Sequence, residues 1–382
     1  CNVRAVPPRK KLKSEDRMTQ VQPMTPSKPT TRETKPKART TKIVIDKAGS
    51  YDRLRVVDAK TPEPGPNEVR IDVEAAGMNC ADVIVRMGLY ASAKELVGWP
   101  ITPGFEVAGV VSAVGSKVTD LDVGTRVVAV TLFNGYASTL IAPRHQVFVL
   151  PESLSFVEGA SLPAVFLTAH FALHSLANPR PTDHLLVHSA AGGVGGALVQ
   201  LGKLHGCTVT GVVGGSHKVD TALKHGCDHV IDKSKQDLWK EAERIAPKGF
   251  DVVLDANGVA TLKDSYDHLS RPGKLVVYGF STMMPKTGGR PNYLKLAVDY
   301  LRTPRFNPLD MTNESRSVLA FNLSYLFDRT DILEEGMADV MRWLAEGKIT
   351  PPPATTYPLA KVADAHRDIE SGTTVGKLVL LP

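Results

Sequence analysis

The stretch that most constrains this chain runs from His184 to Leu204. It consists of a short apolar run, a glycine-dense turn and a segment with helical spacing. This combination suits a dinucleotide phosphate, because the turn brings backbone N–H groups close to the pyrophosphate and the helix N-terminus adds partial positive charge. A glycine motif alone is weak support for that function, so the surrounding pattern has to carry the prediction.

The surrounding pattern is an alternation of strands and helices. Further β-like runs occur at 208–213, 250–255 and 274–278, and a last strand is expected at 317–322. Apolar runs that alternate with helical segments predict an α/β fold with a parallel, doubly wound sheet. The alternative is a glycine turn that packs a helix on a strand and binds no ligand, and the repetition of the pattern disfavours it.

The rest of the chain has a different character. Residues 43–150 alternate short strand-like runs with Gly, Pro and Asn turns, which is typical of a compact barrel-like domain. Residues 282–313 are irregular, with several Gly and Pro. Outside the strands already named, the spacing predicts helices at 155–178, 293–300 and 331–346 and a strand at 376–381.

The basic residues are concentrated at the N-terminus. Residues 1–42 hold 12 Lys or Arg against 3 Asp or Glu, whereas the remainder holds 34 against 37, a net charge of −3. A nearly neutral folded part argues against nucleic-acid binding. The basic segment has few apolar residues, so we expect a disordered tail. Because the sequence begins with Cys1, this segment could be a targeting segment, a solvated tail or sequence upstream of a start at Met18 or Met24.

The cysteines and the hydropathy pattern suggest a cytoplasmic protein. None of the four Cys form a CxxC pair, which favours a reducing intracellular compartment over a disulfide framework. No apolar run reaches the roughly 18 residues of a membrane span. We expect a cytoplasmic location, with an organelle-targeted or membrane-peripheral pool if the N-terminal segment acts as a signal.

Short motifs spread over residues 43–382 resemble the medium-chain dehydrogenase/reductase superfamily, and within it the zinc-free quinone oxidoreductase branch. The segments 305–309 and 320–323 are most similar to the vesicle amine transport protein subgroup of that branch. The matching motifs are Pro62-x-Pro-Gly-Pro66, Gly77-Met-Asn-Cys-Ala-Asp82, Pro103-Gly-Phe-Glu106, Val123-Gly-Thr-Arg-Val127, Gly135-Tyr-Ala137, Leu167-Thr-Ala-His170, Ala190-Ala-Gly-Gly-Val-Gly195 and Gly376-Lys377.

The resemblance implies a Rossmann doubly wound parallel sheet inserted into a GroES-like β-barrel-type domain. The GroES-like catalytic domain would span 43–168 and return at 323–382, with the NAD(P)-binding domain at 169–322 and the active site in the cleft between the two. The resemblance also implies a small-molecule substrate and a homodimer, and it implies vesicle-membrane association for some relatives.

Zinc-dependent members of the superfamily bind catalytic zinc through a Cys and a His. The resemblance places Asn79 and Phe105 at those positions, and neither an amide nor a phenyl ring replaces a soft ligand of Zn²⁺. Cys80, beside the first position, is expected to be a small buried residue. Residues 107–150 contain no Cys, so a structural zinc lobe is not expected either. We therefore predict no metal, which removes ordinary alcohol dehydrogenation.

The sequence after the second nucleotide-domain strand favours NADPH over NADH. An NAD site usually places an acidic residue about 20 residues beyond the glycine turn, but residues 213–218 contain none. Ser216 and Lys218 could instead bind a 2′-phosphate, and Lys233 would add a second cation. The spacing from Ser216 to Lys218 is one residue shorter than in many relatives. The alternative is that both lysines are surface charges.

The expected catalytic residues are Asn79 and Tyr90. The Asn79 amide would bind the nicotinamide ribose or the acceptor carbonyl, Tyr90 would donate a proton or line the pocket, and Asp82 would hold the turn by local hydrogen bonds. A quinone needs no strong acid–base pair, because water can protonate the product. The expected cofactor-binding residues are Asn79, Thr168, Ala191, Gly192, Gly193, Val194, Gly195, Ser216, Lys218, Lys233, Asn257, Gly279 and Lys377.

The leading hypothesis is a zinc-independent, NADPH-dependent oxidoreductase that transfers hydride to quinones or related α,β-unsaturated carbonyls. A second hypothesis is reduction of enoyl thioesters, which needs a proton donor, and Tyr90 is the residue we would name. A third is an NADPH-binding, vesicle- or membrane-associated interaction protein with little turnover. An enzyme would consume NADPH with a quinone, whereas a binding protein would bind NADPH saturably without consuming it.

Overall fold

The structure is a computed structural model that describes residues 38–382. The disordered tail expected at 1–42 therefore lies outside the described residues except for its last five. Of these, Arg39 to Lys42 are ordered in strand β1 (Arg39–Val44), so the tail boundary expected at residue 42 is wrong at this point. In the part of the chain that is described, none of the helices is both long and apolar enough to cross a membrane.

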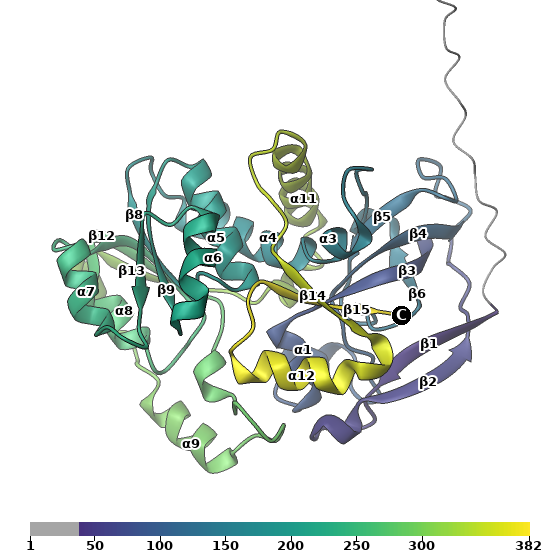
Figure 1. Cartoon of the computed structure of the whole chain (residues 1–382), viewed down its shortest axis with the longest axis horizontal. Helices are drawn as coiled ribbons and strands as arrows, with labels where there is room; N and C mark the ends of the chain where they lie inside the picture. The colour runs from purple at the N-terminus through teal and green to yellow at the C-terminus, as the bar shows by residue number, and fades with distance from the viewer. Residues whose placement is uncertain (1–37) are drawn as a thin grey trace, which may run out of the picture. The chain divides into compact units, whose positions relative to one another are not determined.

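A six-stranded parallel sheet forms one half of the described chain (Figure 1). Its strand order is β10-β9-β8-β11-β12-β13, and every neighbouring pair is parallel. Numbered from β8, this is the order 3-2-1-4-5-6 of a Rossmann sheet, so the predicted doubly wound fold is confirmed. The strands are β8 (His184–His188), β9 (Thr208–Val213), β10 (His229–Asp232), β11 (Phe250–Asp255), β12 (Leu269–Val277) and β13 (Arg316–Ala320).

The helices of this half are α5 (Gly193–Leu204), α6 (Val219–His225), α7 (Leu238–Ile245) and α8 (Leu262–Asp267), with α9 (Tyr293–Arg302) and α10 (Pro308–Glu314) between β12 and β13. Helix α9 lies where a helix was expected, whereas α10 was missed. Its N-cap is Asn307, whose side chain accepts from the Leu309 backbone N–H at 3.1 Å, and Pro308 at N1 is pre-set for a helix start.

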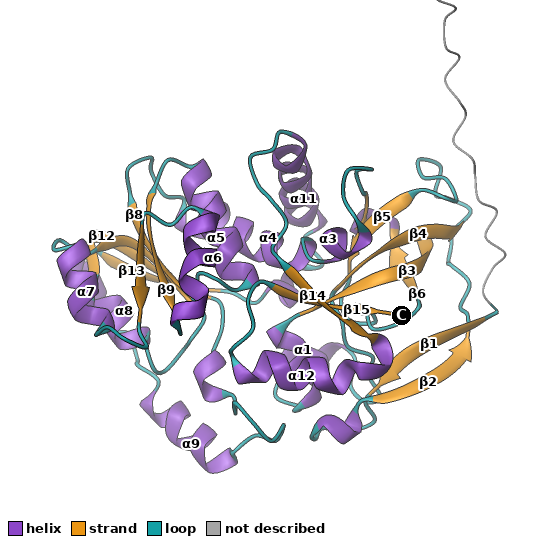
Figure 2. Cartoon of the chain, in the orientation of Figure 1, coloured by secondary structure: helices purple, strands orange, loops and turns teal. Residues whose placement is uncertain are grey.

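The second half contains a seven-stranded sheet that is mostly antiparallel (Figure 2). Its strands are β14 (Ala354–Pro358), β15 (Lys377–Leu381), β3 (Glu68–Met78), β4 (Glu106–Val114), β5 (Arg126–Val130) and β7 (Val147–Val149) in that order, and β6 (Thr139–Pro143) pairs with β3. Strands β1 and β2 (Arg55–Lys60) pair with each other in a separate two-stranded antiparallel sheet. Because the C-terminal β15 pairs with β3, the chain returns to its first domain after the parallel sheet, as the GroES-like architecture requires.

Helices and short turns join these sheets. The longer ones are α1 (Cys80–Arg86), α2 (Ala91–Leu96), α3 (Phe156–Ala160), α4 (Pro163–His170), the π-helix η3 (Phe171–Ala177), α11 (Thr330–Ala345) and α12 (Val362–Ser371). The 3-10 turns are η1 (Tyr51–Arg53), η2 (Arg144–Gln146), η4 (Ser216–Lys218), η5 (Ser281–Met283), η6 (Leu323–Leu326) and η7 (Leu359–Lys361). Ser155 and Glu158 form a capping box that begins α3.

Aromatic side chains meet where η3, α5 and α11 pack together. The His174 ring stacks on His170 at 4.3 Å and on Trp343 at 5.3 Å between centroids, and its Nε2 lies 3.2 Å from Nε2 of His205. Burial, reinforced by the charges that His170 and His205 would carry, lowers the pKa of His174 to about 4. The folded protein therefore holds this imidazole neutral.

This histidine makes the fold acid-sensitive. Between about pH 6.5 and 4 the unfolded chain binds a proton on His174 that the folded chain does not, so the free energy of unfolding falls with pH by up to about 3 kcal/mol. The variant His174→Phe keeps an aromatic stack without a titratable ring and should lose much less stability over this range. Urea unfolding at a series of pH values measures the difference. His217→Phe, at an exposed site, is the control, and an unchanged slope in His174→Phe would contradict the assignment.

Candidate active site

The glycine turn lies between the end of β8 and the start of α5. Gly192 is the N-cap of α5 and provides no side-chain cap, so the first-turn amides of this twelve-residue helix are left for another acceptor. A Cβ on Gly195 would lie 2.1 Å from the Ser189 carbonyl oxygen, so this position requires glycine for helix and strand to pack. Ala191 is buried, while Gly192, Gly193 and Val194 are partly exposed.

The C-terminal strand of the other sheet reaches this turn. The Gly376 N–H donates to the Ala191 carbonyl at 2.9 Å, and Gly376 forms a parallel bridge with Gly192. Gly376 has φ of +66°, and a Cβ there would lie 2.0 Å from the Pro353 carbonyl oxygen. Glycine at this point therefore allows the return strand to bring Lys377 beside the dinucleotide turn.

Lys377 belongs to a buried ionic network with Glu106 and Asn79. The Lys377 ammonium lies 2.5 Å from Glu106 Oε1 and donates to Asn79 Oδ1 at 2.6 Å, while Asn79 Nδ2 donates to the same Glu106 oxygen at 2.8 Å. The Lys377 and Glu106 side chains are 3 % and 0 % exposed. The other oxygen, Glu106 Oε2, accepts the Ala164 N–H at 2.8 Å. Both polar atoms of the Asn79 side chain are thus engaged, and their orientation is fixed.

Asp82 holds the turn that carries Asn79, as predicted. Its Oδ2 accepts the Asn79 N–H at 2.8 Å, and its Oδ1 accepts the Gly104 N–H at 2.8 Å. Cys80, in contrast, is exposed, so the expectation that it would be a small buried residue is wrong. It is the first residue of α1, directly after the cap, where its side chain escapes the packing that covers Asp82.

Tyr90 packs beside Phe105 and contacts residues that follow the last strand of the parallel sheet. Its hydroxyl donates to Asn322 Oδ1 at 2.9 Å and lies 2.9 Å from Ser324 Oγ, both of which follow β13. Its ring packs edge-on against Phe105 at 5.9 Å. Burial raises the pKa of Tyr90, so the phenol stays protonated at neutral pH. Asn322 and Ser324 escaped the sequence analysis because nothing in the sequence pairs them with a residue more than two hundred positions earlier.

The carboxyl ends of β11 and β12 carry further expected residues. The Asn257 N–H donates to Asp255 Oδ1 at 2.7 Å, and Gly279 is the second residue after β12. Tyr278 follows β12 directly, and its buried hydroxyl has no hydrogen-bond partner among residues 38–382. On α4, Thr168 Oγ1 donates to the Ala164 carbonyl at 2.6 Å. Tyr278 was not anticipated, and its orphaned hydroxyl marks a place where a polar ligand group would fit.

The residues expected at the 2′-phosphate gather around η4. Ser216 Oγ donates to Asp232 Oδ2 at 2.5 Å, and Lys218 Nζ donates to the Gly372 carbonyl at 2.6 Å. Burial, and next the charge of Lys233, lowers the pKa of Lys218. Burial, and next the charge of Lys286, lowers the pKa of Lys233. The sequence analysis missed Lys286, which lies in the irregular stretch after β12.

These observations test whether a dinucleotide phosphate fits. The uncapped α5 N-terminus suits a pyrophosphate, and the mutually repelling lysines would be stabilised by an additional anion. Tyr278, whose hydroxyl has no partner among residues 38–382, directly follows β12 at the strand ends where a Rossmann ligand binds. The residues present therefore fit a phosphorylated nicotinamide dinucleotide.

Asn79 and Phe105 stand where zinc-dependent members of the superfamily carry metal ligands. Within residues 38–382, no three His, Cys, Asp or Glu side chains gather as a metal site would require. Asn79 is committed to Glu106 and Lys377, and Phe105 packs between Tyr90 and Phe133.

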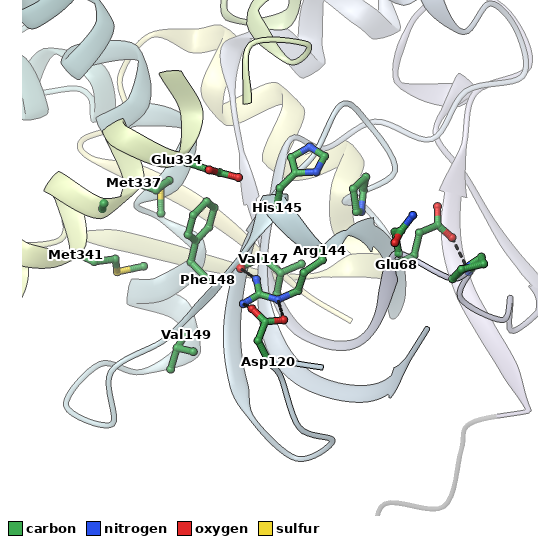
Figure 3. A pocket seen from close by; sticks show the side chains of 15 residues that line it. Glu68, Asp120, Arg144, His145, Val147, Phe148, Val149, Glu334, Met337 and Met341 are labelled. Atoms are coloured by element: carbon green, nitrogen blue, oxygen red, sulfur yellow. Dashed lines mark hydrogen bonds and ion pairs between the residues drawn. The ribbon is translucent and has the colours of Figure 1, made fainter. Parts of the chain in front are cut away.

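A groove of about 1170 Å³ lies elsewhere, between α11 and the β6–β7 region (Figure 3). Arg144 there is paired with Asp120, its Nη2 lying 2.8 Å from Oδ2. Met337 and Met341 line the opposite wall. None of the expected site residues lines this groove, so it is separate from the candidate active site.

Comparison with known proteins places this architecture in a family. Residues 65–162 match the alcohol dehydrogenase GroES-like domain family, and residues 225–380 match the zinc-binding dehydrogenase family. The chain is 34 % identical over 343 residues to the human synaptic vesicle membrane protein VAT-1 homolog, covering 89 % of this chain and 86 % of the relative. The chain belongs to the medium-chain dehydrogenase/reductase superfamily. Within the superfamily it falls in the quinone oxidoreductase and VAT-1-like branch.

Two further relatives are reductases by name. A 2-haloacrylate reductase from Burkholderia sp is 33 % identical over 345 residues, covering 89 % of this chain and 98 % of the relative. The crystal structure of Escherichia coli quinone oxidoreductase complexed with NADPH superposes with a TM-score of 0.77 at 29 % identity, covering 90 % of this chain and all of that one. This medium-chain member is thus an oxidoreductase of NADPH type.

The Glu106–Lys377 pair should dominate the stability of the junction. Lys377→Met leaves the Glu106 carboxylate buried without its cation, which costs roughly 3–5 kcal/mol in the free energy of unfolding. Adding Glu106→Gln should recover part of this loss, because the remaining groups are neutral. Urea unfolding of both single variants and the double variant gives the coupling energy.

The matched control is Arg329→Ala, which breaks the exposed pair with Asp331 and should cost less than about 1 kcal/mol. A Lys377→Met variant as stable as the Arg329→Ala variant would contradict the assignment.

Proposed function

We propose that this protein is a zinc-independent, NADPH-dependent reductase that transfers hydride to quinones or related α,β-unsaturated carbonyls. The observation that carries the proposal is the meeting of the uncapped α5 turn, the Lys377–Glu106–Asn79 network and Tyr90 at one junction. The E. coli relative complexed with NADPH and the 2-haloacrylate reductase support both the cofactor and the class of acceptor. A homodimer is the expected assembly.

The cofactor is held by backbone and by cations. The amides of Gly193, Val194 and the preceding turn bind the pyrophosphate, with Ala191, Gly192 and Gly195 shaping the turn. The 2′-phosphate would be held by Ser216, Lys218 and Lys233, with Ser216 donating to it in place of the Asp232 carboxylate. The nicotinamide end would be held by Thr168, Asn257, Gly279 and Lys377.

The chain's own residues orient the reactants and supply a proton, while NADPH supplies the hydride when bound. The Lys377–Glu106 pair fixes the Asn79 amide, which positions the nicotinamide ribose or the acceptor carbonyl. Tyr90, kept protonated by burial, would donate its hydroxyl proton to the acceptor oxygen in place of Asn322 Oδ1. A quinone product takes its protons from water, whereas reduction of an enone needs a proton at carbon, for which Tyr90 is the available donor.

The 2′-phosphate assignment predicts a cofactor-selective defect. Lys218→Ala and Lys233→Ala should each raise the KM for NADPH about tenfold or more, because a charge-assisted hydrogen bond contributes roughly 1.5–3 kcal/mol. The KM for NADH should change little. Lys224→Ala, at an exposed position on α6, is the control. Steady-state kinetics with both cofactors measures the ratio, and an equal loss with NADH would count against phosphate binding.

The acceptor class is tested by NADPH oxidation with 9,10-phenanthrenequinone, with and without EDTA. We expect quinone-dependent, chelator-insensitive consumption of NADPH. Tyr90→Phe should slow an enone acceptor by about 10²-fold or more and the quinone much less, because only the enone needs a positioned proton donor. Tight NADPH binding without turnover of either acceptor would instead favour the NADPH-binding, membrane-associated interaction protein.

A further inference from the structure

The segment 281–289, which we call the strap, connects the two halves of the protein. It follows the end of β12 and leads toward α9. At its start, the Ser281 N–H donates to the Ala256 carbonyl and the Thr282 N–H donates to the Asn257 carbonyl, both at 3.0 Å. Asn257 is one of the residues expected to bind the cofactor. The strap therefore begins at the edge of the dinucleotide site.

The other end of the strap is anchored in the GroES-like domain. Arg86 Nη1 of α1 donates to the Gly289 carbonyl at 3.0 Å, and Ser50 Oγ, before η1, donates to the Gly288 carbonyl at 3.2 Å. Met284 packs against the hydrophobic core of the same domain. In Figure 1 the strap belongs to the green chain beside α9 that extends toward α12. The strap is thus fixed at both ends, one in each half.

The anchor in the GroES-like domain is buried and rigid. Arg86 pairs with Glu370 of α12, and their side chains are 0 % and 1 % exposed. The second Glu370 oxygen accepts the Tyr51 hydroxyl at 2.6 Å. Gly289 is itself buried, with φ of +65°, and a Cβ there would lie 2.8 Å from Arg86 Nη1. Glycine is therefore required where the strap meets this ion pair.

The strap carries an exposed lysine between its two anchors. Lys286 lies between Thr282 and Gly288, and the strap contains no acidic residue. Burial, and next the charge of Lys286, lowers the pKa of Lys233. Because Lys218 also interacts with Lys233, the Lys233 ammonium is within electrostatic reach of one lysine from η4 and one from the strap. An anion placed among these cations would remove their repulsion.

We propose that Lys286 is a third cation for the 2′-phosphate of NADPH, and that the Arg86–Glu370 pair positions the strap that carries it. This inference rests on the proposed function, which assigns the same phosphate to Lys218 and Lys233. An ammonium beside a phosphate makes a charge-assisted hydrogen bond. NADH has a hydroxyl in place of this phosphate, so Lys286 would favour NADPH. Arg86 is a positioning residue, because it acts on the cofactor through the strap.

The first test is equilibrium binding of NADPH and of NADH, measured by fluorescence titration. Lys286→Ala should weaken NADPH binding about tenfold and leave NADH binding almost unchanged, because a hydrogen bond to a charged group contributes that much. Lys286→Arg should retain the NADPH affinity. Lys248→Ala is the matched control, since Lys248 is exposed but precedes β11 at the opposite end of the sheet from Asn257. An unchanged NADPH affinity in Lys286→Ala, or an equal loss for both cofactors, would overturn the proposal.

The second test separates the anchor from general backbone strain. Gly288 and Gly289 both have positive φ, +82° and +65°, so alanine strains the backbone at either position. A Cβ on Gly288 would meet no atom of residues 38–382 within 4 Å, whereas one on Gly289 would collide with Arg86 and Ser50. Gly289→Ala should therefore weaken NADPH binding toward the level of Lys286→Ala with little effect on NADH. Gly288→Ala should bind both cofactors as the unmodified chain does.

Unchanged NADH binding shows that a variant is folded, because NADH needs the same glycine turn. If Gly289→Ala behaves as Gly288→Ala does, or loses NADH binding equally, the positioning role of the anchor is wrong.

Failure of this inference and failure of the proposed function give different results. If Lys218→Ala and Lys233→Ala lose the preference for NADPH and Lys286→Ala keeps it, the 2′-phosphate site stands and the strap has no part in it. If none of the three variants loses the preference, the phosphate site itself is wrong. Loss of the preference in all three is the expected result.

Discussion

The ion pair between Glu106 and Lys377 is the interaction on which the rest of the site depends. A buried carboxylate is stable only when its charge is compensated and its lone pairs are filled. Glu106 achieves this with Lys377, the Asn79 amide and the Ala164 N–H, which belong to β15, the cap of α1 and the start of α4. Three segments far apart in the sequence are thereby fixed to one carboxylate, and the glycine turn is joined to them through Gly376.

This constraint ties the glycine turn to the turn that carries Asn79. The return strand that supplies Lys377 also bridges Gly192, so the position of the dinucleotide turn and the orientation of Asn79 are set by the same backbone. Tyr90 makes a second connection through Asn322 and Ser324. These contacts fix the parallel sheet and the barrel-type sheet relative to each other. A reaction between a hydride donor and an acceptor requires such fixed positions.

Local patterns predicted the strands better than the partners of individual side chains. Strands 208–213 and 250–255 match β9 and β11 residue for residue, because each is a continuous apolar run bounded by turns. No local sequence pattern indicates that Lys377 pairs with Glu106. The signals that could have suggested it are the acid in Pro103-Gly-Phe-Glu106 and the lone Lys before an apolar strand. Cys80 was misjudged because exposure at a helix start depends on the surrounding loops. Helix α10 was missed because prolines nearby suggested a loop.

The departures from ordinary packing in this chain share one explanation. Lys218 is a partly buried cation whose pKa is lowered further by the charge of Lys233, and the Tyr278 hydroxyl is buried without a partner among residues 38–382. Each arrangement costs free energy in the isolated chain, and natural sequences retain such costs where a partner removes them. Both lie where a phosphorylated dinucleotide fits.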